Sequence, residues 1–185
     1  MNCQLFDFQP QCGYNADMAT APPQALVRQQ KETWQAYFDA TRLLLDELDR
    51  RVNQDAGISL ADFGVLARLA DGDEWGVRMS ELADSTVSSR SRMSHAVDRL
   101  ETLGLVERRA CPTDRRGSYA SLTEAGRVKL AEAQPGHADT VLRYLFNQLS
   151  AEEVDGLLGS MTTIKTSLQQ LPRASAQAGE LDSAR

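Results

Sequence analysis

The sequence predicts a mainly helical chain of the α+β class, in which one short β-hairpin interrupts a series of helices. Apolar residues recur at helical spacing from Val27 to Val52 and again from Val154 to Leu171. Between them lie two short runs of β character, LVERRAC at 105–111 and YASL at 119–122, joined by the tight loop PTDRRGS. These three observations predict two long helical segments on either side of a small unit that contains strands.

In the first half of the chain, prolines and capping residues mark the expected helix boundaries. Pro22 and Pro23 precede the first helix, and Ser59 is placed to cap the second with Asp62 three residues on. After the turn DGDEWG a very short strand and a brief helix capped by Ser80 are expected. The expected elements are helices over 24–52 and 59–70, a strand over 77–79 and a helix over 80–85.

Similar signals mark the elements of the second half. Gly104 is a suitable C-terminal stop, and Thr123 is placed to cap a long helix that we expect to kink at Pro135. Ser150 and Glu153 have the spacing of a capping box. The expected elements are a helix over 88–104, strands over 105–111 and 119–122, a helix from 123 to about 149 and a last helix from 150 to 171.

Composition excludes several classes of protein. No apolar run approaches the roughly 18 residues of a membrane-spanning helix. The first basic residue is Arg28, so the start lacks the charged region of a secretory signal, and we expect a cytoplasmic protein without membrane contact. Met18 is an alternative start. Cys3, Cys12 and Cys111 form no C-x-x-C pair, so no disulfide framework, metal site or cofactor is expected.

The charge of the chain is unevenly distributed. The window 88–118 holds seven arginines against four acidic residues and so carries +3, whereas the rest of a chain of net charge −6 carries −9. A basic face on an acidic body suits a protein that presents one surface to phosphate groups. The alternative is a solvated helix face in a chain that uses arginine in preference to lysine.

The order helix, short strand, helix, helix, strand, loop, strand is the order of a winged helix-turn-helix. The helix at 88–104 is then the natural recognition helix for double-stranded DNA. Its period places Ser91, His95, Asp98 and Thr102 directly opposite the apolar face, with two arginines alongside and two further residues in the first turn. The candidate DNA-binding residues of this helix are Ser89, Arg90, Ser91, Arg92, His95 and Arg99.

The loop between the two strands is the candidate wing. Arg115 and Arg116 lie at its tip, where guanidinium groups could enter a narrow minor groove. Asp114 is placed to orient one of them by a charge-assisted pair, and Gly117 lets the backbone turn. The alternative is a plain charged hairpin.

The candidate wing and the start of the following helix resemble those of a known family. The stretch DRRGSYASLTEAG fits the D-x-R-x5-L-T-x-x-G wing signature of the MarR (multiple-antibiotic-resistance regulator) family at Asp114, Arg116, Leu122, Thr123 and Gly126. RMSELAD (78–84), SRSRMSHAVDRLETLGLVERR (89–109) and CPTDRRG (111–117) are also similar to members, and the resemblance covers roughly 24–171. It implies a transcriptional repressor that binds a pseudo-palindromic operator as an obligate homodimer and is released by a small aromatic or phenolic effector.

The resemblance also implies that the first and last two helices interlock between subunits. The sequence independently favours this, because the apolar stripes of the last two helices exceed what a small winged lobe needs to cover. An intramolecular helical bundle is the alternative. The candidate dimerisation residues are Val141, Leu145, Leu149, Val154, Leu158 and Met161.

The expected domains follow from these assignments. They are an N-terminal extension without clear order at 1–21, an N-terminal dimerisation helix and linker at 22–58, the winged helix-turn-helix lobe at 59–122, C-terminal dimerisation helices at 123–171 and a disordered tail at 172–185.

Two kinds of signal could release the protein from its operator. Aromatic residues and one arginine of the first two helices are candidates for an effector pocket, with plain core packing as the alternative. Cysteine oxidation is a second possibility, with Cys111 at the wing base as the first suspect. The candidate pocket residues are Trp34, Tyr37, Phe38, Arg42 and Phe63.

Two other classes of function compete with a DNA-binding regulator. An enzyme is disfavoured, because the two histidines are far apart and the chain has no H-E-x-x-H, P-loop, G-x-G-x-x-G or G-x-S-x-G motif. A winged domain used only for protein interaction is the other alternative.

Overall fold

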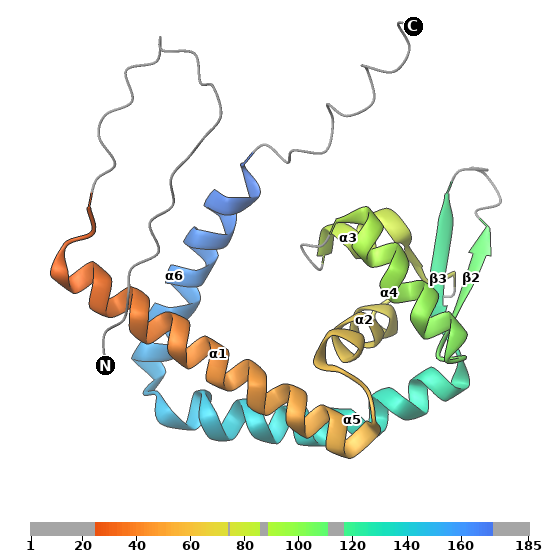
Figure 1. Cartoon of the computed structure of the whole chain (residues 1–185), viewed down its shortest axis with the longest axis horizontal. Coiled ribbons are helices and arrows are strands. Elements are labelled where there is room, and N and C mark those ends of the chain that lie inside the picture. Colours follow the sequence, from red (N-terminus) through yellow and green to blue (C-terminus); the bar gives the residue numbers. More distant parts are fainter. Residues whose placement is uncertain (1–24, 74, 86–88, 111–116, 172–185) are drawn as a thin grey trace, which may run out of the picture. The chain divides into compact units, whose positions relative to one another are not determined.

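Figure 1 shows a computed structural model of the chain, which describes residues 25–73, 75–85, 89–110 and 117–171. The extension at 1–21 and the tail at 172–185 lie outside the described residues. The chain divides into two compact units, 1–39 and 40–185. The elements are α1 (Arg28–Ala56), α2 (Leu60–Ala70), β1 (Val77–Arg78), α3 (Met79–Ser85), α4 (Arg90–Thr102), β2 (Val106–Ala110), β3 (Ser118–Leu122), α5 (Glu124–Tyr144), the 3-10 helix η1 (Phe146–Gln148) and α6 (Ala151–Gln169).

The three strands form one antiparallel sheet in the order β1-β3-β2, which confirms the predicted hairpin and the mainly helical α+β class. β2 pairs with β3 so that Ala110 lies opposite Ser118 at the open end. β1 adds only two residues, pairing Val77 with Ala120. Because the chain enters α3 at Met79, Ser80 lies inside that helix, and the prediction that it is the N-cap is wrong.

α2 is the central helix of the second unit. It contacts α3, α4, α5 and β3, and Figure 1 shows it between α4 and α5. α4 contributes the face that its period predicts, since Met93, Val97 and Leu100 are all buried. The largest fully buried side chains of the core come from four helices and are Leu66, Leu82, Leu100, Val52 and Val97.

The predicted caps of three helices are confirmed. The hydroxyls of Ser59, Thr123 and Ser150 each accept a hydrogen bond from the backbone N–H three residues on. Ser150 and Glu153 bond reciprocally, as a capping box requires. Ser89 caps α4 in the same way, so this helix begins at Arg90, two residues later than predicted.

Helix ends differ from the prediction where the chain enters or leaves the core. α1 continues four residues past 52, because Val52 and Ala56 both pack in the core, and it stops at Gly57, which has a φ of 68°. α5 remains helical through Pro135 but ends at Tyr144 rather than near 149. The chain then forms η1 and reaches an extended Leu149, which gives α6 a separate start. None of the helices among the described residues has both the length and the apolar character to cross a membrane.

Thr123 and Gly126 join the start of α5 to the turn between α4 and β2. The Thr123 hydroxyl donates to the Gly104 carbonyl at 2.7 Å, and the Thr123 N–H donates to the Leu105 carbonyl at 3.1 Å. A Cβ at position 126 would lie 2.0 Å from the Leu105 oxygen, closer than any side chain permits. The L-T-x-x-G pattern therefore has a structural cause in this close approach of two backbones.

We predict that Gly126→Ala destabilises the protein by about 2–3 kcal/mol, the usual cost of forcing extra atoms into a packed site. The measurement is chemical or thermal unfolding. Gly64→Ala is the matched control, because a Cβ there meets nothing within 4 Å and removing a helical glycine stabilises by about 0.4–1 kcal/mol. Equal stabilities of Gly126→Ala and wild type would contradict the close approach.

Candidate nucleic-acid interface

α4 carries a polar, exposed surface along the side opposite its buried face. Ser91, Arg92 and His95 are exposed, as are Ser89 and Arg90 at its start. The Ser89 hydroxyl accepts from the Arg92 N–H at 3.3 Å, which holds the first turn in helical form. Hydroxyl, imidazole and guanidinium groups are side chains that reach base edges and phosphates in protein–DNA contacts.

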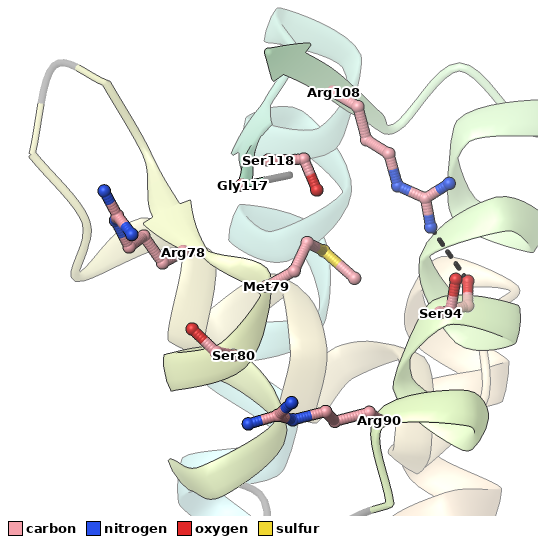
Figure 2. A pocket seen from close by; sticks show the side chains of 8 residues that line it. All are labelled: Arg78, Met79, Ser80, Arg90, Ser94, Arg108, Gly117 and Ser118. Atoms are coloured by element: carbon pink, nitrogen blue, oxygen red, sulfur yellow. Dashed lines mark hydrogen bonds between the residues drawn. The ribbon is translucent and has the colours of Figure 1, made fainter. Parts of the chain in front are cut away.

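A concavity of about 610 Å³ lies beside this surface. Three arginines from three different elements line it: Arg78 from β1, Arg90 from the first turn of α4, and Arg108 from β2 (Figure 2). The full lining is Arg78, Met79, Ser80, Arg90, Ser94, Arg108, Gly117 and Ser118. Three guanidinium groups around one concavity favour an anionic partner.

Arg108 fastens the hairpin to α4. Its Nη2 donates to the Ser94 carbonyl at 2.9 Å, as Figure 2 shows. Its Nη1 forms an ion pair with Asp98 and lies 3.6 Å from the Glu101 carboxylate, which also accepts from the Arg108 backbone N–H at 3.2 Å. Asp98, expected to point directly away from the core, therefore bonds to β2, because the strand folds across that flank of the helix.

Arg78 is held at the other side of the concavity by Tyr119 of β3. The Arg78 Nε donates to the Tyr119 hydroxyl at 3.0 Å, and its guanidinium carbon lies 5.3 Å from the ring centroid. Cation–π attraction and the hydrogen bond both restrict this side chain. Arg78 was not among the predicted DNA-binding residues; its position one residue before a short helix, in RMSELAD, was the available signal.

The structure brings the other candidate DNA-binding residues to different places. Arg99 is on the exposed side of α4, but its guanidinium pairs with Asp62 of α2. Asp114, Arg115 and Arg116 lie outside the described residues, as does Cys111. The ends of the strands that carry them, Ala110 and Ser118, are directly paired.

The candidate effector residues do not share one environment. Trp34, Tyr37 and Phe38 are about half exposed on α1, and the Trp34 ring centroid lies 6.0 Å and 5.8 Å from the other two. Arg42 is also exposed. Phe63 is buried in the core of the second unit, which fits the alternative of plain core packing.

His137 of α5 stacks on Phe63 with ring centroids 4.5 Å apart. Burial lowers the pKa of His137, because the charged imidazolium loses hydration there. The preceding Gly136 is packed against the Arg51–Asp55 ion pair of α1, where a Cβ would lie 1.9 Å from the Asp55 carboxylate. His137 thus lies where α1 and α2 both contact the middle of α5.

Comparisons with known proteins agree with a winged helix-turn-helix regulator. The model of the MarR family matches residues 56–117. The chain is 31% identical to the HTH-type transcriptional regulator MhqR of Bacillus subtilis over 63% of this chain and 77% of that protein. It is also similar to two Streptomyces coelicolor MarR family regulators of solved structure. One is Sco3205 in complex with DNA (39% identity, TM-score 0.77, 81% of this chain and 94% of that one). The other is AbsC (31% identity, TM-score 0.76, 80% and 99%).

We predict that His137 makes the folded state sensitive to mild acid. Its pKa is lowered on folding, so its contribution to stability is complete above the ordinary histidine pKa of about 6.5 and is lost as pH falls through the folded value. The melting temperature should therefore fall as the pH is lowered below about 6.5, and His137→Leu should flatten that fall. His95→Gln is the control and should keep it. A fall of equal size in His137→Leu would show that another group is responsible.

Proposed function

The chain belongs to the MarR family of transcriptional regulators, and we propose that it is a cytoplasmic, homodimeric repressor that binds a pseudo-palindromic operator through α4 and the wing. The observation that carries the proposal is the cationic concavity beside the exposed, capped start of α4. The similarity to Sco3205, which was solved in complex with DNA, supports DNA as the partner of this chain.

In this proposal α4 enters the major groove, which is wide enough for one helix and presents a distinct pattern at each base pair. Ser91 and His95 contact base edges from its exposed face, whereas Arg90 and Arg92 contact phosphates on either side. Arg115 and Arg116 of the wing enter the adjacent minor groove, oriented by Asp114. Arg78, held by Tyr119, adds positive charge between these two contacts, whereas Arg108 holds the hairpin against α4 through Asp98.

The homodimer is supported by apolar side chains that the single chain leaves uncovered. None of the residues of α6 is buried, and Leu158, Ile164 and Leu168 are each at least half exposed. Leu142 and Phe146, at the end of α5 and in η1, are exposed as well. All six candidate dimerisation residues are only partly buried or exposed. A stripe of this length in water favours a second copy of the chain as its cover.

Release by a small aromatic or phenolic effector stays a prediction from the sequence. It depends on residues of α1 whose surroundings in a dimer differ from those in one chain. Oxidation of Cys111 is the alternative signal, and that residue lies outside the described part of the chain.

We predict that Arg90→Ala and Arg92→Ala each weaken binding to a duplex that the wild-type protein enriches from a random-sequence DNA library. Each lost phosphate contact should lower the slope of log affinity against log salt by about 0.9. Ser91→Ala and His95→Ala should instead change which bases are preferred, at about 1–3 kcal/mol per contact. The measurement is fluorescence anisotropy at several salt concentrations.

Arg68→Ala is the matched control for the arginine variants, since Arg68 is an exposed arginine of α2 outside the concavity. It should retain wild-type affinity. Wild-type behaviour in all four α4 variants would remove α4 from the DNA-binding surface.

We predict that Leu158→Glu disrupts the dimer, because a carboxylate in the middle of the apolar stripe of α6 would have to be buried between subunits. Sedimentation equilibrium should then show a monomer or a much weaker dimer. Thr166→Glu, at an exposed position on the side of the same helix opposite the stripe, controls for the added charge. A wild-type dimer in Leu158→Glu would mean that the stripe of α6 faces something other than the partner.

A further inference from the structure

Asp62 is a buried carboxylate that the proposed DNA contacts do not use. It lies in the first turn of α2 and is 7% exposed, one of only two polar residues buried among those the structure describes. Its Oδ1 pairs with Nη2 of Arg99, which is 37 positions later in the sequence and belongs to α4. An ion pair therefore joins the central helix of the lobe directly to the candidate recognition helix.

Both oxygens of this carboxylate are engaged. Oδ2 accepts from the Ser59 hydroxyl at 2.8 Å, and that hydroxyl in turn accepts from the Asp62 N–H at 3.1 Å. In the same turn, the backbone N–H of Leu60 donates to the carboxylate of Asp49 in α1 at 2.8 Å. The start of α2 thus makes separate polar contacts with α1 and with α4.

A buried carboxylate is costly unless it is paired, so the position of Arg99 is strongly constrained by its partner. The buried face of α4 fixes which side of the helix meets the core, and the ion pair adds a directional contact at the flank of that face. The Asp62–Arg99 pair acts on the C-terminal half of α4, away from the Arg90 turn. A small rotation there changes where Arg90 and Ser91 lie relative to a groove.

We propose that Asp62 is a positioning residue for DNA binding, which sets the orientation of α4 through Arg99. Arg99 is then a structural partner of Asp62 rather than a phosphate contact. The proposal rests on the proposed function, since it takes α4 as the recognition helix.

The negative charge of Asp62 allows a positioning role to be distinguished from a purely electrostatic effect on DNA affinity. Asp62 is negative, so removing its charge from a DNA-binding lobe should, by long-range electrostatics alone, leave binding unchanged or make it tighter. A positioning role requires the opposite, that loss of this acidic residue weakens binding. A role limited to stability would lower the melting temperature without changing the affinity of the folded protein.

The experiment compares Asp62→Asn, Arg99→Gln and the double variant, as full-length chains, on the duplex enriched by wild type. Affinities are measured by fluorescence anisotropy across a salt series, at a temperature where thermal melts show each variant folded. Glu81→Gln, which removes an exposed carboxylate of α3 in the same lobe, is the matched control. If wild type enriches no duplex, the proposed function fails before Asp62 is tested.

We expect Asp62→Asn and Arg99→Gln each to bind about tenfold more weakly, with an unchanged salt slope, and the double variant to be no weaker than either, because both remove one interaction. Glu81→Gln should bind as wild type or tighter. Should Asp62→Asn be unfolded, Arg99→Gln decides alone, since Arg99 is a half-exposed side chain. Wild-type or tighter binding by folded Asp62→Asn overturns the proposal, and so does a fall of about one unit in the salt slope of Arg99→Gln.

Discussion

The packing of α4 against α2 is the constraint on which the rest of the lobe depends. Met93, Val97 and Leu100 are buried on one face, which places the polar face outward. Because the core is close-packed, this face resists rotation of the helix, and polar contacts on its flanks add directional restraints. Two arginine–carboxylate pairs supply direction: Arg99 to Asp62 on one flank and Arg108 to Asp98 on the other. The concavity and the exposed first turn of α4 follow from that fixed orientation.

These ion pairs reduce the number of arginines in the basic window 88–118 that are available to an outside anion. The window 88–118 is rich in arginine, but Arg99, Arg108 and Arg109 are each paired with a carboxylate. Within the part of the chain that the structure describes, no ion pair joins Arg90 or Arg92 to an acidic residue. The acidic residues of the window therefore orient some arginines and leave others to an outside anion, which a count of charges does not reveal.

Local features of this chain were predictable from the sequence, and contacts between distant residues were not. The caps Ser59, Thr123 and Ser150 depend on residues three positions apart, and the hairpin depends on one turn, so the sequence carries both signals. A helical period shows that Asp98 and Arg99 lie opposite the core, yet it cannot show what folds across them. The early end of α5 at Tyr144 has the same origin: the sequence continues a helical pattern, and the break at Leu145 separates α6 as a new helix.

In the proposed complex with DNA, the same arrangement gives a reason why two lobes would bind better than one. With several arginines held internally, a single α4 offers few side chains for phosphate contacts, and each contact contributes a modest, salt-dependent share of affinity. Two lobes joined by a stable interface convert the second binding event into an intramolecular one, which raises affinity without new contacts. That gain requires the two copies of α4 to be spaced by one helical turn of DNA, about 34–36 Å, or by a multiple of it. The uncovered apolar stripe of α6 is therefore as necessary to DNA recognition in the proposed dimer as the arginines of the lobe, because the interface it forms would set that spacing.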